Sequence, residues 1–337
     1  MQIKIALASL GLGLLATHVQ AGFLAAPASP AEKPGWPSVK RADDQQLLIK
    51  PSINILSNYS DRDVLLLNYG TTLGQLESSF YNTGLKYTDS AFDKAGFPKN
   101  TRAFYEQAAK NTQTQLDGYN SLLGKGVPQP CVWKFPVQDV ASFVQTSDVI
   151  GFIMSSVYTS GLQYLVDPDL HAAAASILGT KARQSAWISG VIRGGSPISN
   201  AFETPMDLDQ AWTLALSFIQ SCPQSNLPLP VRVFNPLNIT TPAASIGTGK
   251  KISLNFTPVN TTSTTYWAAF LQGLETTYIP LQGKAPYSVT IPQSLKGFSF
   301  LIIANDTQKI SNDFVTMAGP VVLDLPSNGH PFLFPTN

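Results

Sequence analysis

Apolar residues recur at three- and four-residue spacing in five stretches of the first two thirds of the chain. This spacing places them on one face of a helix. It predicts helices over residues 61–84, 100–123, 137–166, 169–192 and 207–220. Because short turns join most of these segments, we expect one all-α bundle. The Val64–Tyr81 stretch is the most informative, since its apolar face carries one carboxylate, Glu77.

After about residue 227 the pattern changes to short alternating runs that are typical of β-strands. The predicted strands are Val231–Phe234, Lys251–Phe256, Thr265–Phe270, Tyr287–Ile291, Phe298–Ala304 and Pro320–Leu325. Turns rich in Pro, Gly and Asn separate them, which favours an antiparallel sandwich of about seven strands. The predicted fold class is therefore α+β: a helical bundle over 42–226 and a β-sandwich domain over 227–337.

The N-terminal segment is typical of a processed leader. Residues 1–21 combine Lys4, an apolar run over 5–16 and a small-residue cleavage site, Val19-Gln20-Ala21, as in a secretory signal. A buried N-terminal helix is the alternative. Residues 22–41 are rich in Pro and Ala and end in Lys40-Arg41, where a kexin-type protease would cut; a plain linker is the alternative. We expect an exported mature chain that begins near Ala42.

The charge balance argues against nucleic acid as a partner. Without residues 1–41 the formal charge changes from +1 to −2, with 18 basic and 20 acidic residues left and no basic cluster. No later apolar run has the length of a membrane span, and the C-terminus lacks the apolar tail of a lipid-anchor signal. The expected product is soluble and located outside the cell or at the cell wall.

Charged residues make up only 13% of the chain, so glycans are a candidate source of solubility. Asn-x-Ser/Thr sequons occur at Asn58, Asn238, Asn255, Asn260 and Asn305. Four of them fall in the last hundred residues, which favours glycosylation of an exported protein.

Two cysteines, Cys131 and Cys222, are an even count for an oxidising compartment. A disulfide between them is the leading interpretation, and it would close a loop of about 90 residues. Two buried free thiols are the alternative. Neither cysteine has a histidine nearby that would make it a nucleophile.

Common catalytic motifs are absent from the sequence. The Gly247–Lys250 stretch lacks the first glycine of a phosphate loop, so we expect a β-turn. No Gly-x-Ser-x-Gly elbow occurs, and a serine triad would have to use His171 or His330, which we interpret as ordinary helix-start and turn residues. The acidic pairs Asp167/Asp169 and Asp207/Asp209 stand where helices begin, which the helix dipole favours without a metal.

Several stretches together resemble the ferritin-like desiccation-related family and its fungal stress-response members of the rds type. They are Leu67–Tyr81 in the first helix, Ile177–Trp187, Ala201–Pro205, Phe218–Pro223, and in the β-rich tail Tyr266–Phe270, Tyr278–Leu281 and Met317–Pro320. The resemblance covers about residues 50–330. It implies a ferritin-like bundle followed by a β-domain, and a role in stress or desiccation.

A dimetal site of this bundle type needs a Glu from each of two helices and a Glu-x-x-His from each of the other two. The resemblance places these ligands at Glu77, at Thr112 and Gln115, at Asp148, and at Lys181 and Gln184. None of the three histidines, at 18, 171 and 330, follows a carboxylate by three residues. We therefore expect vestigial site positions with no metal and no cofactor. Glu77, Asp148 and Lys181 should form an inward ion-pair network, with Gln115 and Gln184 as amide partners.

Three functions remain open. The leading hypothesis is an exported, non-enzymatic glycoprotein that acts in stress tolerance, at the cell surface or at a host interface. The first alternative is a metal-binding oxidoreductase with a degenerate site around Glu77 and Asp148. The second is cell-wall or carbohydrate binding through the sandwich, by way of Tyr266, Trp267, Tyr278 and Tyr287. The sequence names no partner; a cell-wall polysaccharide and a host protein are the two candidates.

Overall fold

The computed structural model describes residues 59–198, 200–257, 265–281, 283–307, 314–325 and 332–334. All of them belong to one compact unit that spans Val39–Asn337. Helices come first and antiparallel sheets follow, so the α+β class is confirmed. The predicted leader with Lys40 and Arg41, and also Asn58, Asn260 and His330, lie outside the described residues.

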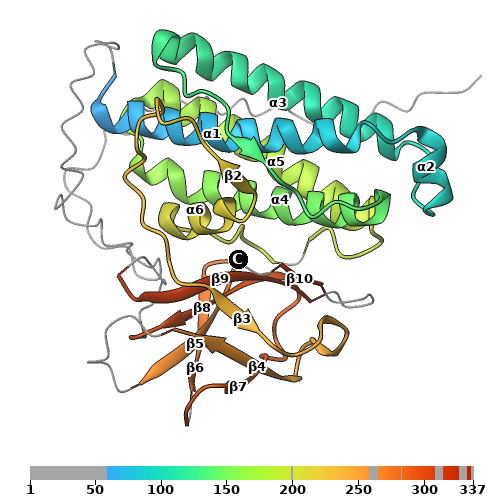
Figure 1. The fold of residues 1–337 in the computed structure, drawn as a ribbon, viewed down its shortest axis with the longest axis vertical. Helices are drawn as coiled ribbons and strands as arrows, with labels where there is room; N and C mark the ends of the chain where they lie inside the picture. Colours follow the sequence, from blue (N-terminus) through green and yellow to red (C-terminus); the bar gives the residue numbers. More distant parts are fainter. Residues whose placement is uncertain are drawn as a thin grey trace, which may run out of the picture. The chain divides into compact units, whose positions relative to one another are not determined.

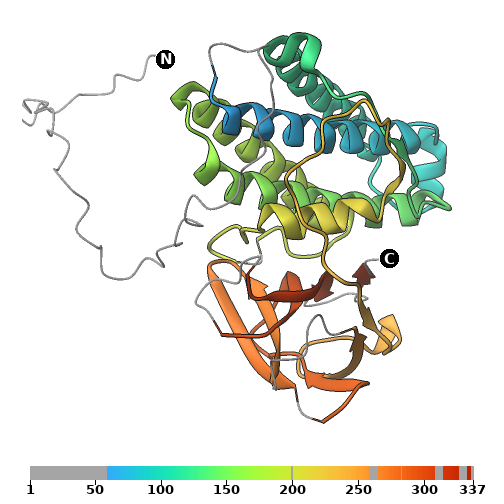
Figure 2. The same ribbon diagram turned by 60° about the vertical axis from the view of Figure 1, so that its left-hand side comes forward.

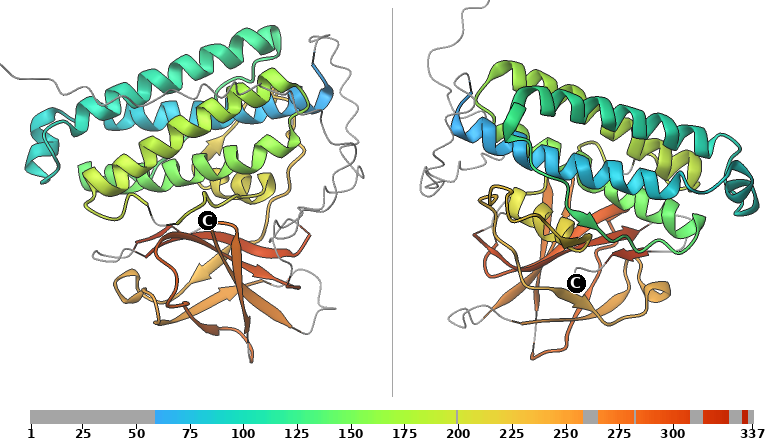
Figure 3. Two further views of the ribbon diagram at one scale, coloured as in Figure 1. Left: turned by 180° about the vertical axis from the view of Figure 1, so that it is seen from behind. Right: turned by 45° about the horizontal axis from the view of Figure 1, so that its top comes forward.

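Four long helices form the bundle (Figures 1 and 3). They are α1 (Asp61–Gly84), α3 (Thr101–Leu123), α4 (Val140–Gly161) and α5 (Pro168–Trp187). Helix α1 packs along α3, and α4 packs along α5. A short α2 (Asp89–Lys94) connects α1 to α3, and α6 (Leu208–Leu216) lies between the bundle and the sheets. The sequence pattern did not predict α2, which has only six residues and is too short to show a period.

Polar caps begin these helices where the sequence placed them. The side chain of Ser60 accepts from the backbone N–H of Asp63 at the start of α1. Asp139 and Asp207 each form a capping box, the second one with Gln210. Asp167 accepts from two backbone N–H groups at the start of α5. The prediction that the acidic pairs are helix starts is therefore confirmed.

Three helices end earlier than predicted. Helix α4 ends at Gly161 and a 3-10 turn, η2 (Leu162–Tyr164), follows it, whereas the helix was predicted to reach residue 166. Helix α5 changes at Trp187 into a π-turn, η3 (Ile188–Ile192), which still fills the predicted range. The fifth predicted helix was wrong at its end: α6 stops at Leu216, and β2 (Ile219–Ser221) pairs with β1 (Val132–Trp133). The strand pair replaces the last turn of the predicted helix, because the predicted disulfide joins Cys131 to Cys222 directly beside the two strands.

Aromatic rings fill the end of the bundle near the C-terminus of α1. Phe143 is fully buried and stacks on Phe80 with ring centroids 4.8 Å apart. The chain needs glycine at position 84, since an added Cβ would lie 2.0 Å from the Phe143 ring. Among the described helices, the stretch Val140–Tyr164, which is α4 and its last turn, is long and apolar enough to cross a membrane. The expectation that no later apolar run reaches the length of a membrane span was therefore wrong for this stretch. However, 83% of its apolar window is buried inside the protein, as in a core helix.

Two antiparallel sheets follow the bundle (Figure 2). The five-stranded sheet has the order β10-β9-β8-β5-β6 and the three-stranded sheet the order β3-β4-β7. The strands are β3 (Leu237–Ile239), β4 (Lys251–Phe256), β5 (Tyr266–Gln272), β6 (Glu275–Leu281), β7 (Tyr287–Thr290), β8 (Gly297–Ala304), β9 (Thr316–Leu325) and β10 (Phe332–Phe334). The predicted strand at 231–234 was wrong, and pairing begins instead at Leu237, opposite Phe256.

The strands β5, β8 and β9 of the five-stranded sheet are buried on both faces, against the helices and against the small sheet. Leu301 and Ile303 of β8 pack toward the small sheet, whereas Phe300 and Ile302 belong to the same hydrophobic cluster as the helices. Phe152 of α4 stacks on Phe300, with ring centroids 4.4 Å apart. Strands buried on both faces become continuously apolar, as β8 and β9 are. The bundle and the sandwich therefore share one core.

Candidate functional site

The centre of the bundle holds a buried polar cluster built by three helices. Glu77 of α1, Thr112 of α3 and Lys181 of α5 are each 1% exposed. The Lys181 ammonium donates to Glu77 Oε2 and, at 3.1 Å, to the Thr112 hydroxyl oxygen. That hydroxyl donates to the same carboxylate oxygen at 3.1 Å, and the Tyr81 hydroxyl donates to Glu77 Oε1 at 3.2 Å. Both oxygens of the carboxylate are thus satisfied.

The ion pair explains how two opposite charges persist in this interior. A buried carboxylate is costly unless it is paired and hydrogen-bonded, and here it has an ammonium and two hydroxyl donors. The surrounding phenols stay neutral. Burial, followed by the nearby Glu77 charge, raises the pKa of Tyr81 well above its usual value. Burial also raises the pKa of Tyr119 to about 12. Both phenols therefore keep their protons at physiological pH, and the Tyr81 hydroxyl can donate to Glu77.

The residues present do not fit a metal ion. Lys181 places a cation on Glu77, at the position where the resemblance expects a second carboxylate, and Thr112 offers a neutral hydroxyl. Gln184 replaces an expected histidine; it is 7% exposed, and its buried Oε1 has no hydrogen-bond partner among the residues that the structure describes. Gln115 is half-buried. Across the described ranges, no group of three His, Cys, Asp or Glu side chains could hold a metal.

Asp148 belongs to a second charged cluster, separate from Lys181, which corrects the single network expected from the sequence. It is fully buried in α4 and accepts from the Ser189 hydroxyl at 2.6 Å. Arg193, just after the π-turn, pairs with Asp148 through Nη1 at 2.5 Å and with Asp324 of β9 through Nη2 at 2.6 Å. Asp148 pairs with Arg193 because the π-turn η3, which continues α5, brings Arg193 against α4. One guanidinium thus joins the bundle to the sheet.

Burial makes both carboxyl groups of this cluster weaker acids. Desolvation raises the pKa of Asp148 to about 6, although the Arg193 charge and the Ser189 hydrogen bond oppose the rise. Desolvation also raises the pKa of Asp324. Burial alone would lower the pKa of Arg193, but attraction to the two carboxylates raises it above its usual value. The guanidinium therefore stays charged, and Asp148 titrates in the mildly acidic range.

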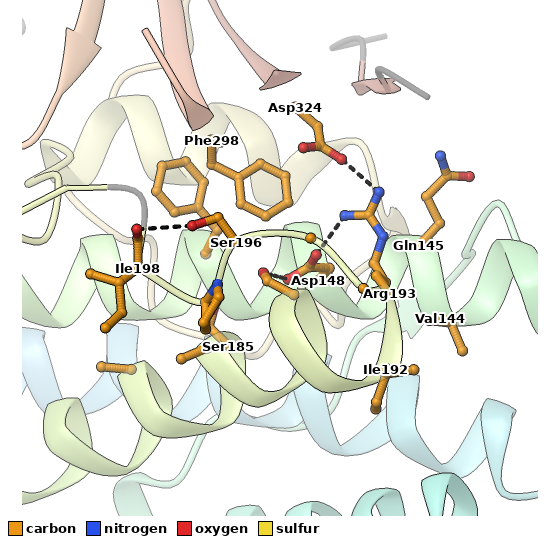
Figure 4. A pocket seen from close by; sticks show the side chains of 18 of the residues that line it. Val144, Gln145, Asp148, Ser185, Ile192, Arg193, Ser196, Ile198, Phe298 and Asp324 are labelled. Atoms are coloured by element: carbon orange, nitrogen blue, oxygen red, sulfur yellow. Dashed lines mark hydrogen bonds and ion pairs between the residues drawn. The ribbon is translucent and has the colours of Figure 1, made fainter. Parts of the chain in front are cut away.

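A cavity of about 730 Å³ opens above this second cluster (Figure 4). Its walls come from α4, from α5 with its π-turn, from the loop after Arg193, and from β8 and β9. Asp148, Arg193 and Asp324 lie along one side, and the Phe298 ring lies on another. Two lining residues, Ile198 and Phe202, are 79% and 52% exposed, so they mark the opening of the cavity.

The four aromatic residues considered for carbohydrate binding do not form one surface. Tyr266 and Tyr287 pack on the two sides of Phe256, each at 5.2 Å between ring centroids, in the core between the sheets. Trp267 and Tyr278 pack against the other cluster, on the side of the helices. Tyr266 and Trp267 are neighbours on β5, so period-two alternation places them on opposite faces of the five-stranded sheet. Tyr287 belongs to the three-stranded sheet.

The structure also places three other features of the sequence: His171, the Gly247–Lys250 stretch and the described sequon residues. His171 is half-buried, and its Nδ1 lies 3.2 Å from the Asp167 carbonyl oxygen at the start of α5. The Lys250 N–H closes a turn onto the Gly247 carbonyl at 3.1 Å, so the β-turn prediction is confirmed. The sequon residues Asn238 and Asn255 are exposed and directly opposite each other on β3 and β4. Asn305 is half-buried.

Sequence reasoning missed Ser189, Arg193 and Asp324 as members of a site. Asp324 carried a usable signal, because it is a single acid inside the apolar strand Val321–Leu325. A charged residue in a strand that is buried on both faces must have a partner. The sequence offered no signal for the identity of that partner, since Arg193 lies 131 positions away.

The comparisons with known proteins agree with this architecture. Residues 62–194 match the ferritin-like domain family, and this range coincides with the helical part of the chain. Protein rds1 of Schizosaccharomyces pombe is 29% identical to this chain over 189 residues. The alignment covers 55% of this chain and 46% of that relative, so the match spans about half the length of the relative.

Proposed function

We propose that this protein is an exported, non-enzymatic, ferritin-like glycoprotein that acts in stress tolerance, at the cell surface or at a host interface. The single observation that carries the non-enzymatic part is the Lys181–Glu77 ion pair at the bundle centre. An ammonium there satisfies the carboxylate as a dication would in a metal-binding relative, and it leaves no anionic ligand set for iron or manganese. The bundle then serves as a scaffold.

The stress-related part of the proposal rests on the family resemblance and on the similarity to Protein rds1. The exported, glycosylated part rests on the leader-like residues 1–41 and on the exposure of Asn238 and Asn255, which can carry glycans from the outer face of the small sheet. N-terminal sequencing of protein secreted with its own leader tests the export step. A chain starting near Ala42 supports the propeptide, and one starting at Gly22 contradicts it.

Metal analysis decides between the scaffold and the degenerate oxidoreductase. The purified protein is incubated with Fe²⁺ or Mn²⁺, desalted and measured by elemental mass spectrometry. We expect substoichiometric metal for the wild type. The matched variant Lys181→Glu with Gln184→His restores one Glu-x-x-His beside Glu77 and should gain a bound ion, because three hard or borderline ligands then face one point. Stoichiometric metal in the wild type would overturn the non-enzymatic proposal.

A further inference from the structure

We infer that the cavity between the bundle and the five-stranded sheet is a binding site for a short neutral oligosaccharide. The cavity belongs to neither the bundle centre nor the aromatic strands considered above. Its volume of about 730 Å³ lies within the usual range for ligand pockets. Protein interiors otherwise close to crystal-like packing, so an open space of this size at the joint between two layers requires a reason.

The charge of the cavity excludes anionic ligands. Asp148, Asp324 and Arg193 together carry a formal charge of −1 at neutral pH, because one guanidinium serves two carboxylates. The other two charged lining residues, Arg183 and Glu203, have opposite signs and offset each other. A phosphate or carboxylate group entering this space would meet net repulsion from carboxylates in a partly desolvated setting.

The same arrangement does not favour a simple cation. Both carboxylates along the side of the cavity are already paired with Arg193, at 2.5 and 2.6 Å. A ligand ammonium would have to displace this guanidinium, which bridges the two carboxylates and cannot lose its charge. A hydroxyl group can instead accept from a guanidinium N–H and donate to a carboxylate oxygen at once. A polyhydroxylated, uncharged ligand therefore matches the charged side best.

The remaining walls suit the two other features of a sugar, which are its polar edge and its apolar ring face. Gln145 from α4 and Ser185 from α5 offer an amide and a hydroxyl, both half-buried. Phe298 supplies an aromatic ring that is held by a stack on Phe152 at 4.9 Å. Phe202, 52% exposed at the opening, is a ring that a bound sugar would cover. Aromatic rings combined with a few convergent polar groups are the usual composition of such pockets.

Isothermal titration calorimetry on the full-length protein tests the inference. The neutral probes are cellotriose, laminaritriose, mannotriose and triacetylchitotriose, with trigalacturonate as the anionic arm and spermidine as the cationic arm. We expect at least one neutral trisaccharide to bind the wild type and neither charged probe to do so. Gln145→Ala and Phe202→Ala should each weaken that binding by about tenfold.

Matched controls separate cavity effects from general effects. Val191→Ala removes an apolar side chain that is 50% exposed on the neighbouring π-turn, and Phe314→Ala removes a ring that is 59% exposed; neither residue lines the cavity. Both should leave binding within about twofold of the wild type. Unchanged melting temperatures would show that the cavity variants fold. The inference fails if no neutral trisaccharide binds, if only a charged probe binds, or if the cavity variants bind like the wild type. Metal content is measured independently, so this failure leaves the proposed function standing.

Discussion

Replacing Lys181 with Met tests the central ion pair directly. Methionine keeps an unbranched chain of similar length and removes only the ammonium. Glu77 would then remain 1% exposed with hydroxyl donors alone, from Tyr81 and Thr112. Breaking a buried pair by removing one partner costs about 3–5 kcal/mol, since the other charge stays buried without compensation. We expect a loss of about 3 kcal/mol, at the lower end, because those two hydroxyl bonds persist.

Urea unfolding with the disulfide intact measures this loss, and a thermal scan should show a decrease of about 5 °C for a chain of this length. Arg183→Met is the matched control, because Arg183 is exposed on the same helix, and its change should stay within about 0.5 kcal/mol. The double variant Glu77→Met with Lys181→Met should recover most of the stability, as both charges are gone. A Lys181→Met loss below about 1 kcal/mol, or no recovery in the double variant, would refute the buried pair.

Three further predictions concern stability. The folded pKa of Asp148, about 6, lies above its unfolded value of 3.8, so its contribution to stability is present below pH 4 and is lost as the pH rises to 6. The stability of the wild type relative to Asp148→Asn should therefore fall by roughly 3 kcal/mol between pH 4 and pH 7. A difference that stays constant with pH would contradict the assignment. In urea unfolding, Gly84→Ala should destabilise the protein by about 1–3 kcal/mol, because the added Cβ overlaps a buried phenylalanine ring. Gly118→Ala, where the added Cβ meets open space, should stabilise the protein by about 0.5–1 kcal/mol. Equal effects of the two substitutions would argue against the overlap. Replacing Cys131 and Cys222 by Ser should cost about 4 kcal/mol of unfolding free energy because it opens a loop of 91 residues, and an unchanged urea midpoint would refute this.

The sequence by itself determined the local structure and the class of fold. The spacing of apolar residues and the polar caps at Ser60 and Asp207 fixed where α1 and α6 begin, because both act over a few neighbouring residues. Spacing alone placed the start of α4 at residue 137, and the structure moves it to Val140, after the Asp139 cap. Turn residues marked the change to strands after the bundle. A single pair of cysteines left one possible disulfide, and the structure has it. The centre of the bundle could be predicted in part, since Glu77 stood alone on an apolar helix face and the family resemblance placed Lys181 at the same site.

Only the tertiary structure decided which partner each charge takes. Lys181 reaches Glu77 across 104 positions, whereas Asp148 turns to Arg193 because a π-turn and a strand bring a guanidinium and a second carboxylate to the same place. The same holds for the five-stranded sheet, whose apolar strands indicated burial but not that helices cover one face and a second sheet the other. Such pairings depend on how layers pack, and packing joins residues whose separation along the chain carries no local signal.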